Sequence, residues 1–287
     1  MEWKRPDLAG RVALVTGSSR GVGRGIALAL GQCGATVYVT GRSSGTNATD
    51  GLAGTVESTA REVTQAGGTG VPMVCDHTRE ADLERVVARL RRDGGRLDLL
   101  VNNAWAGYER YGEAGFSAPF WEQPLWRWDA MFGSVRAHFA ASRACVPLML
   151  PRRSGLVVTV GFDPRRFYLG NVPYDTAKAA KDRMAWGMAL ELRAHGIASV
   201  SLTPGFVRTE RVEAVTGGKG LEGTQSPFYA GRAVAHLAGD SNILAWTGRN
   251  LDVGDLARRY GFTDVDGRQP EPFMPGPKDL LYHDKPL

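Results

Sequence analysis

Tyr174 and Lys178 are the two residues whose types and spacing most directly suggest chemistry. They lie four positions apart in the segment YDTAK, and side chains four apart share one face of an α-helix. A phenol titrates at about pH 10, so it needs a close positive charge to transfer protons near neutral pH. The spacing predicts an acid–base pair with Tyr174 as the proton donor. The alternative is a solvent-exposed pair, and the place of the segment in the chain decides between the two.

A glycine-rich turn, TGSSRGVG at residues 16–23, lies between an apolar run and a helical run. Its glycines would allow the backbone to approach a pyrophosphate, and the amides and dipole at the helix start would bind the charge. We predict a dinucleotide site here; the alternative is a turn without a ligand. The predicted contacts in the turn are Gly17, Ser19, Gly21, Val22 and Gly23.

Two arginines indicate which dinucleotide would bind. In the segment VTGR, Gly41 stands where a carboxylate would accept hydrogen bonds from the ribose hydroxyls, and Arg42 follows it. An arginine at this place accommodates a 2′-phosphate, and Arg20 in the glycine turn would reach the same phosphate from the other side. The pair favours NADP(H); the alternative is that either arginine is a solvated surface charge.

Strands and helices are expected to alternate along the chain. The apolar and β-branched runs predicted as strands are 11–16, 35–42, 70–76, 97–104, 155–160, 197–204 and 250–255. The segments with helical periodicity are 23–34, 54–66, 80–95, 124–150, 173–195 and 227–239. Such strands pair in parallel with right-handed crossovers. The predicted fold is α/β, a Rossmann-type doubly wound sheet of about seven strands with helices on both faces.

Two long stretches interrupt this alternation, residues 104–123 and 205–226. Loops of that length in a compact domain are usually lids or binding loops. We assign both to one cofactor-binding domain over residues 1–255, and we expect the Pro- and Gly-rich residues 256–287 to form an extension packed on the same domain.

Composition restricts the classes of function. The chain has 287 residues, of which 43% are apolar, and a net charge of +5 without a polybasic run, which argues against nucleic-acid binding. No run approaches the roughly 20 apolar residues of a membrane span, and the N-terminus lacks an apolar signal core. Cys33, Cys75, Cys145 and the five histidines show no metal spacing. We predict a cytoplasmic protein with reduced thiols and no metal, membrane or nucleic-acid partner.

With TGSSRGVG, NNA at 102–104, YDTAK and PGFVRTE at 204–210 in this order, residues 8–255 resemble the short-chain dehydrogenase/reductase family. The segments NVPY, ELRAHG, PGFVRTE and YGFTDVDGR are most similar to the branch that contains dehydrogenase/reductase member 1. The resemblance implies an NADP(H)-dependent oxidoreductase acting on a carbonyl or alcohol. It also implies a homodimer or homotetramer paired through the long helices near 124–150 and 173–195.

The resemblance also implies roles for single residues. Tyr174 would be the acid/base, and Lys178 would hold the nicotinamide ribose and lower the pKa of the tyrosine. Asp76 would contact the adenine, and Asn103 would lie near the cofactor. The residues expected to border the nicotinamide are Pro204, Gly205 and Thr209.

Two positions depart from the family pattern. Where the family has an active-site serine, this chain has Gly161 and Phe162, followed by Asp163; where it has an asparagine in the preceding helix, this chain has Ser134. The serine normally donates a hydrogen bond to the substrate oxygen, and losing one such donor costs a factor of roughly 10² or more.

Three explanations compete for the missing serine. Another group could supply the contact, from among Asp163, Thr159, Tyr168 and the 104–123 loop. The chemistry could differ, with an imine or enone as substrate. The fold could bind NADP(H) without turnover, as a regulator. Asp163 itself would face the site, as a neutral donor or an anion, or turn outward as the start of the turn DPRR.

Aromatic side chains in the two long loops suggest a bulky, flat or polycyclic substrate, unless they only pack the loops against the domain. They are Trp105, Tyr108, Tyr111, Phe116, Phe120, Trp121 and Phe206. The side chains that we expect to line the substrate pocket are Trp105, Phe162, Tyr168 and Phe206. Arg165 and Arg166 would meet either an acidic substrate or solvent.

Overall fold

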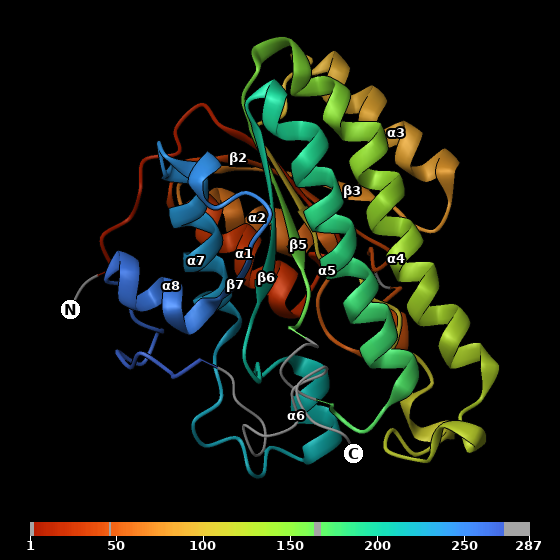
Figure 1. The fold of residues 1–287 in the computed structure, drawn as a ribbon. Coiled ribbons are helices and arrows are strands. Elements are labelled where there is room, and N and C mark those ends of the chain that lie inside the picture. Colours follow the sequence, from red (N-terminus) through yellow and green to blue (C-terminus); the bar gives the residue numbers. More distant parts are fainter. Residues whose placement is uncertain (1–2, 46, 164–167, 273–287) are drawn as a thin grey trace.

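A single parallel sheet forms the centre of the protein. The computed structural model describes residues 3–45, 47–163 and 168–272, and within them seven strands have the order β3-β2-β1-β4-β5-β6-β7 (Figure 1). The strands are β1 (Val12–Val15), β2 (Thr36–Gly41), β3 (Thr69–Val74), β4 (Leu99–Asn102), β5 (Gly155–Val160), β6 (Ile197–Thr203) and β7 (Asn250–Asp252). The predicted doubly wound α/β fold is confirmed.

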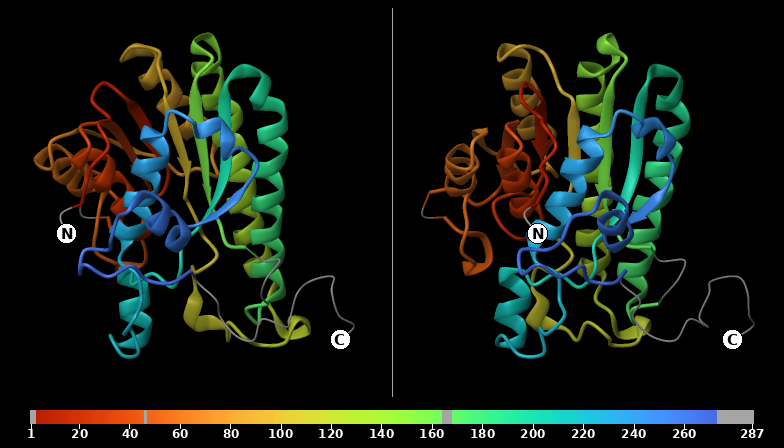
Figure 2. Two further views of the ribbon diagram at one scale, coloured as in Figure 1. Left: turned by 60° about the vertical axis from the view of Figure 1, so that its left-hand side comes forward. Right: turned by 90° about the vertical axis from the view of Figure 1, so that its left-hand side faces the viewer.

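Helices cover both faces of this sheet (Figure 2). The helices on one face are α1 (Gly21–Gln32), α2 (Val56–Gln65), α7 (Pro227–Gly239) and α8 (Val253–Tyr260). Those on the other face are α3 (Glu80–Arg92), α4 (Leu125–Cys145) and α5 (Val172–Leu192). Neighbouring residues of one strand enter opposite cores, as Leu14 and Val15 of β1 do. Burial on both faces explains why the strands are continuous apolar runs rather than alternating ones.

The strand order reverses at β1, which pairs with β2 on one side and β4 on the other. In open parallel sheets a ligand binds in the crevice at such a switch point, outside the carboxyl ends of the strands. The glycine turn that follows β1, Asn103 after β4, Phe162 after β5 and Pro204 after β6 are therefore all brought to one edge of the sheet.

Two helices were not predicted. The stretch 205–226, expected to be irregular, contains α6 (Glu210–Thr216), which lies beyond the carboxyl ends of β5 and β6 (Figure 1). The Thr209 side chain accepts a hydrogen bond from the amide of Val212 at 3.3 Å, and Gly217 ends the helix with φ +61°. These are ordinary helix caps, but seven residues are too few for a helical period to stand out in the sequence.

The second unpredicted helix, α8, begins inside the segment expected to be the last strand and continues into the predicted C-terminal extension, which starts at residue 256. The Asp252 side chain caps it by accepting a hydrogen bond from the amide of Gly254 at 2.7 Å. Phe262 beyond the helix is buried in the core. Residues up to 272 are thus joined to the domain, whereas 273–287 lie outside the described residues. No helix in the described part of the chain combines the length and the apolar character that a membrane crossing requires.

Candidate active site

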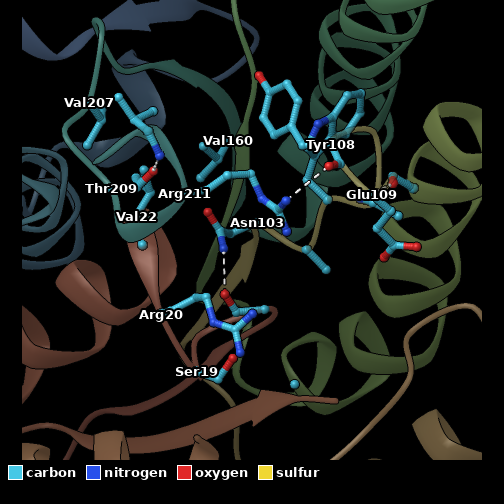
Figure 3. A pocket seen from close by; sticks show the side chains of 18 of the residues that line it. Ser19, Arg20, Val22, Asn103, Tyr108, Glu109, Val160, Val207, Thr209 and Arg211 are labelled. Carbon is cyan, nitrogen blue, oxygen red and sulfur yellow. Dashed lines mark hydrogen bonds between the residues drawn. The ribbon is translucent and has the colours of Figure 1, made fainter. Parts of the chain in front are cut away.

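A cavity of about 760 Å³ opens at the carboxyl edge of the sheet and brings together most of the predicted site residues. Figure 3 shows Ser19 and Arg20 at one end, Tyr108 and Arg211 at the other, and Asn103 between them. The predicted residues that line it are Gly17, Ser19, Arg20, Gly21, Val22, Arg42, Asp76, Asn103, Trp105, Ser134, Phe162, Tyr174, Lys178, Pro204, Gly205, Phe206 and Thr209. The predicted residues that do not line it are Gly23, Asp163 and Tyr168.

The glycine turn has the tight shape that a pyrophosphate cradle needs. Gly17 has φ +65°, and a Cβ there would stand 2.8 Å from the Cα of Ala104. At Gly23 a Cβ would collide with the carbonyl oxygen of Gly17. The side-chain amide of Asn103 donates to the carbonyls of Thr16 and Gly17, both at 3.0 Å. Asn103 therefore holds the glycine turn in shape.

A carboxylate already lies at the start of α1. Glu210, the first residue of α6, accepts a hydrogen bond from the amide of Gly21 at 2.8 Å. This amide and the positive end of the helix dipole are the groups expected to bind a pyrophosphate. Glu210 was not among the predicted site residues, because nothing local in the sequence pairs it with a residue 189 positions away.

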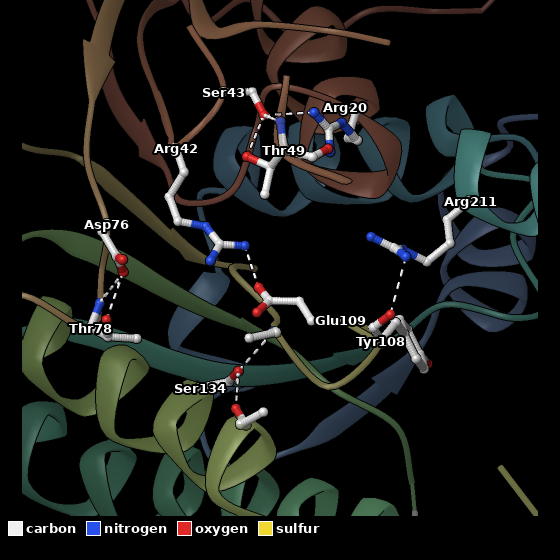
Figure 4. A network of polar contacts seen from close by, with 12 residues as sticks. Arg20, Arg42, Ser43, Thr49, Asp76, Thr78, Tyr108, Glu109, Ser134 and Arg211 are labelled. Carbon is white, nitrogen blue, oxygen red and sulfur yellow. Dashed lines mark hydrogen bonds and ion pairs between the residues drawn. The ribbon is translucent and has the colours of Figure 1, made fainter. Parts of the chain in front are cut away.

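The two predicted phosphate-binding arginines differ in how they are held (Figure 4). Arg20 donates to the carbonyls of Thr49 at 2.9 Å and Ala53 at 3.1 Å, and to the Ser43 hydroxyl at 2.6 Å. Arg42 forms an ion pair with Glu109, another residue that the sequence did not single out. Arg20 thus stabilises the segment after β2 through its hydrogen bonds. Arg42 lines the cavity, and a phosphate that binds it would have to replace the carboxylate of Glu109.

The expected adenine end is formed by residues that follow β3. Asp76 accepts hydrogen bonds from the Thr78 amide at 3.0 Å and the Thr78 hydroxyl at 2.7 Å. Next to it, His77 lies with its Nε2 2.8 Å from the Thr40 hydroxyl. Burial lowers the pKa of His77 to about 4. The imidazole is therefore neutral at physiological pH and serves this end as a hydrogen-bonding group.

The expected nicotinamide end is formed by the loop after β6. The Gly205 amide donates to the side chain of Gln225 at 2.9 Å, and a Cβ on Gly205 would lie 2.8 Å from the Gln225 Cδ. Pro204 and Thr209 line the same end of the cavity. Since the Thr209 hydroxyl caps α6, this loop and the helix that carries Glu210 form one unit.

Tyr174 and Lys178 lie together in the cavity, on the first turns of α5. Asn171 begins this helix, accepting a hydrogen bond from the Tyr174 amide at 2.8 Å and donating to the Phe116 carbonyl at 2.6 Å. The Lys178 Nζ lies 5.2 Å from the centre of the Tyr174 ring. Burial raises the pKa of Tyr174 well above its ordinary value and lowers that of Lys178 to about 8. The direction for Tyr174 is opposite to the lowering that the family resemblance implies, and burial is its main cause.

A second buried lysine of α5 lies close to Tyr174 and Lys178. Lys181 is 1% exposed, and its Nζ lies 3.4 Å from the Nε2 of His138. The Nζ atoms of Lys178 and Lys181 each lie 4.3 Å from a ring centre of Trp105. Burial lowers the pKa of both Lys181 and His138 well below their ordinary values, and the charge of Lys178 adds to this effect. The sequence feature that could have indicated Lys181 is the segment KAAK, in which it follows Lys178 by three positions, a spacing that places both on one face of a helix.

Phe162 occupies the place expected for the serine. Its side chain is 4% exposed, lines the cavity and has its ring centre 6.4 Å from that of Tyr174. Ser134, at the asparagine position, accepts a hydrogen bond from the Ala106 amide at 2.9 Å and donates to the Ala130 carbonyl at 3.0 Å. Its hydroxyl is thus engaged in holding the 104–123 loop against α4.

The other predicted substitutes for the serine lie outside the cavity lining. Asp163 is 8% exposed, which does not fit the outward-turned alternative, and it does not line the cavity. Thr159 is buried in β5 and Tyr168 is largely exposed, and neither lines the cavity. Arg165 and Arg166 lie outside the described residues.

The long-loop aromatics divide into two groups. Trp105, Tyr108, Phe116 and Phe206 line the cavity, whereas Phe120 and Trp121 are exposed away from it. The side chain of Tyr111 is outside what the structure describes. The substrate end of the cavity therefore has aromatic walls, with the phenol of Tyr174 among them. Among the described residues, no cluster of histidine, cysteine and acidic side chains has an arrangement suited to a metal ion.

Comparison with known proteins gives concordant matches. The family model of short chain dehydrogenases matches residues 11–219. Dehydrogenase/reductase SDR family member 1 from Homo sapiens is 40% identical over 280 residues, which cover 92% of this chain and 86% of that protein. The protein of the same name from Mus musculus is 40% identical over 276 residues, covering 91% and 85%. A solved short chain dehydrogenase from Mycobacterium thermoresistibile is 30% identical, with a TM-score of 0.79 over 98% of this chain and 97% of that one.

Proposed function

The chain belongs to the short-chain dehydrogenase/reductase family, as its ordered motifs predict, and from this premise we propose that it is an NADP(H)-dependent oxidoreductase. The proposed reaction interconverts a bulky, aromatic or polycyclic carbonyl compound and its alcohol. The observation that carries the proposal is that Tyr174 and Lys178 line the same cavity as the glycine turn and Arg42.

Two observations support a dinucleotide in this cavity. The glycine turn has no room for side chains at Gly17 and Gly23, as the tight bend and the close helix packing of a dinucleotide-binding turn require. The Gly21 amide already binds a carboxylate, that of Glu210, so the start of α1 accepts an anion. Arg42 supports the 2′-phosphate, because its guanidinium enters the cavity and needs only to exchange Glu109 for a phosphate.

When bound, the nicotinamide would donate or accept the hydride. Tyr174 would transfer the proton to the substrate oxygen during reduction, and Lys178 would bind the ribose and stabilise the phenolate that Tyr174 becomes. The apolar walls exclude water from the reacting groups, which strengthens each of these interactions. Trp105, Phe116 and Phe206 would form a flat slot beside Tyr174 for the rest of the substrate.

The charges favour a carbonyl over an imine. Lys178 places a basic group beside Tyr174, and Asp163 does not line the cavity. A developing oxyanion is stabilised by such an environment, whereas an iminium cation is destabilised. The presence of Tyr174 and Lys178 in one cavity favours an enzyme over a regulator that binds NADP(H) without turnover. Such a regulator needs no phenol in its cofactor cavity.

The exposed sides of α4 and α5 support assembly of copies of this chain. Phe139 on α4 and Trp186 and Leu190 on α5 are exposed apolar residues, the kind of surface that a dimer buries. We therefore propose a homodimer or homotetramer through these helices, which light scattering of the purified protein would test.

The deciding experiment measures NADPH oxidation with a panel of bulky ketones, quinones, enones and imines. We expect turnover of a quinone or ketone with the unmodified protein and its collapse in Tyr174→Phe, which keeps the ring but loses the transferable proton. Cofactor binding by the variant, measured by calorimetry, should be unchanged. Binding of NADPH without oxidation of any member of the panel would favour the regulator instead.

A further inference from the structure

Tyr108 is the aromatic side chain of the 104–123 loop that makes a polar contact with Tyr174. The two rings lie nearly parallel, with centres 6.2 Å apart and an interplanar angle of 25°. Burial is the main cause that raises the pKa of Tyr174, and Tyr108 raises it further through its charge and through a side-chain hydrogen bond with Tyr174. Both residues line the cavity. The two phenol side chains therefore lie together in the cavity.

Among the described residues near Tyr174, the other neutral polar side chains are engaged within the protein or do not reach the cavity surface. The hydroxyl of Ser134 is bonded on both sides within the protein. The indole Nε1 of Trp105 is buried without a hydrogen-bond partner, so it does not reach the cavity surface. Phe162 offers no donor. Among the described lining residues near the Tyr174 hydroxyl, Tyr108 is left as the side chain that can present a neutral O–H to a ligand.

The backbone around Tyr108 is held at several points, which keeps its hydroxyl in place. Arg211 of α6 donates to the Tyr108 carbonyl at 3.1 Å (Figure 3). The Ala106 amide is bound by Ser134, and the Glu109 amide donates to the Ala106 carbonyl at 3.1 Å. A donor held before the reaction needs no reorganisation as charge develops, and this is the property that makes such donors effective.

We propose that Tyr108 is a catalytic residue that donates the second hydrogen bond to the substrate oxygen, the contact that a serine makes elsewhere in the family. The inference rests on the proposed oxidoreductase function and names the group that compensates for Phe162. During reduction the substrate oxygen lies between the two phenols. Tyr174 transfers its proton to that oxygen and becomes a phenolate, whereas Tyr108 keeps its proton and stabilises the developing negative charge.

The test compares single and double variants with phenanthrenequinone and NADPH. Tyr108→Phe removes one hydroxyl, so we expect kcat to fall by about 10²-fold, the usual cost of losing one such donor, with NADPH affinity unchanged. Phe162→Ser added to Tyr108→Phe should restore kcat at least about tenfold by returning a donor to the usual place. Tyr38→Phe is the matched control, since the Tyr38 hydroxyl bonds Asp93 away from the cavity, and its turnover should not change.

The pH profile supplies a readout that a purely structural role would not change. Tyr174 must be protonated to act as the acid, so reduction is lost as pH rises through its pKa. Since Tyr108 raises that pKa, the loss of activity in Tyr108→Phe should move to lower pH.

Three outcomes would overturn the inference. Turnover of Tyr108→Phe within about twofold of the unmodified protein, well short of the expected loss, would exclude the role of Tyr108 and leave the proposed function intact. A loss that includes NADPH affinity and is not restored by Phe162→Ser would assign Tyr108 to structure instead. An unmodified protein that oxidises NADPH with neither this quinone nor the rest of the panel would overturn the proposed function, and the role of Tyr108 with it.

Discussion

Glu210→Gln tests whether an internal carboxylate competes with the cofactor. The Glu210 carboxylate accepts a hydrogen bond from the Gly21 amide at 2.8 Å, at the N-terminus of α1. A pyrophosphate bound at this amide must displace the carboxylate and overcome its negative charge. The glutamine keeps the shape of the side chain and a weaker hydrogen bond, but it removes the charge.

The expected change in NADPH affinity follows from the charge interaction between Glu210 and the start of α1, which Glu210→Gln removes. A carboxylate at a helix N-terminus contributes about 0.3–1 kcal/mol at an exposed site and up to about 2 kcal/mol when partly buried. We expect the NADPH affinity of Glu210→Gln to rise by about tenfold, which corresponds to about 1.4 kcal/mol. The free energy of unfolding of the protein without ligand should fall by about 1 kcal/mol for the same reason.

Titration calorimetry with NADPH gives the affinity, and urea denaturation gives the unfolding free energy. The matched control is Glu213→Gln, on the same helix, whose carboxylate lies 3.8 Å from Arg208 and is exposed. An affinity of Glu210→Gln equal to that of Glu213→Gln would refute the competition. A weaker affinity would mean that Glu210 assists binding, for example by keeping α6 against the glycine turn.

Three further predictions concern the cofactor preference, the acid and the buried lysines. Calorimetry should show NADPH binding at least tenfold tighter than NADH, about 1.4 kcal/mol, and Arg42→Asp should abolish or invert that preference; equal affinities in the unmodified protein would contradict the assignment. Tyr174→Phe should abolish turnover while keeping NADPH affinity, whereas Lys178→Ala should lower both, and near-normal turnover of the first variant would mean that another group donates the proton. Burial lowers the pKa of Lys178 to about 8 and that of Lys181 well below its ordinary value, so around and above pH 8 the unfolded chain binds more protons than the folded one, and the unfolding free energy should rise with pH up to about 10. Lys181→Met should weaken that rise and raise the melting temperature at neutral pH, because it replaces a desolvated amine by an apolar side chain of similar length; a lower melting temperature with an unchanged pH dependence would show that the contact with His138 outweighs the burial cost.

Local patterns in the sequence determined the fold class and the helix that carries Tyr174 and Lys178. Apolar runs separated by helical segments predict parallel pairing, and the seven-stranded sheet follows from that rule. The glycine turn and the spacing of Tyr174 and Lys178 are also local, because each depends on the geometry of one turn or one helix. Such features can be predicted because residues a few positions apart have nearly the same relation in every helix or tight turn.

Only the tertiary structure decided which groups meet in the cavity. Glu210 binds an amide 189 positions away, and Arg42 pairs with a residue 67 positions away. The approach of Tyr108 to Tyr174, which we propose supplies the missing donor, likewise joins the loop after β4 to the start of α5. These contacts depend on the strand order and on how the loops pack at the sheet edge, and no spacing in the sequence encodes them. The burial of Lys181 has the same origin, since the sequence places it on α5 but the packing of α4 against α5 removes it from water.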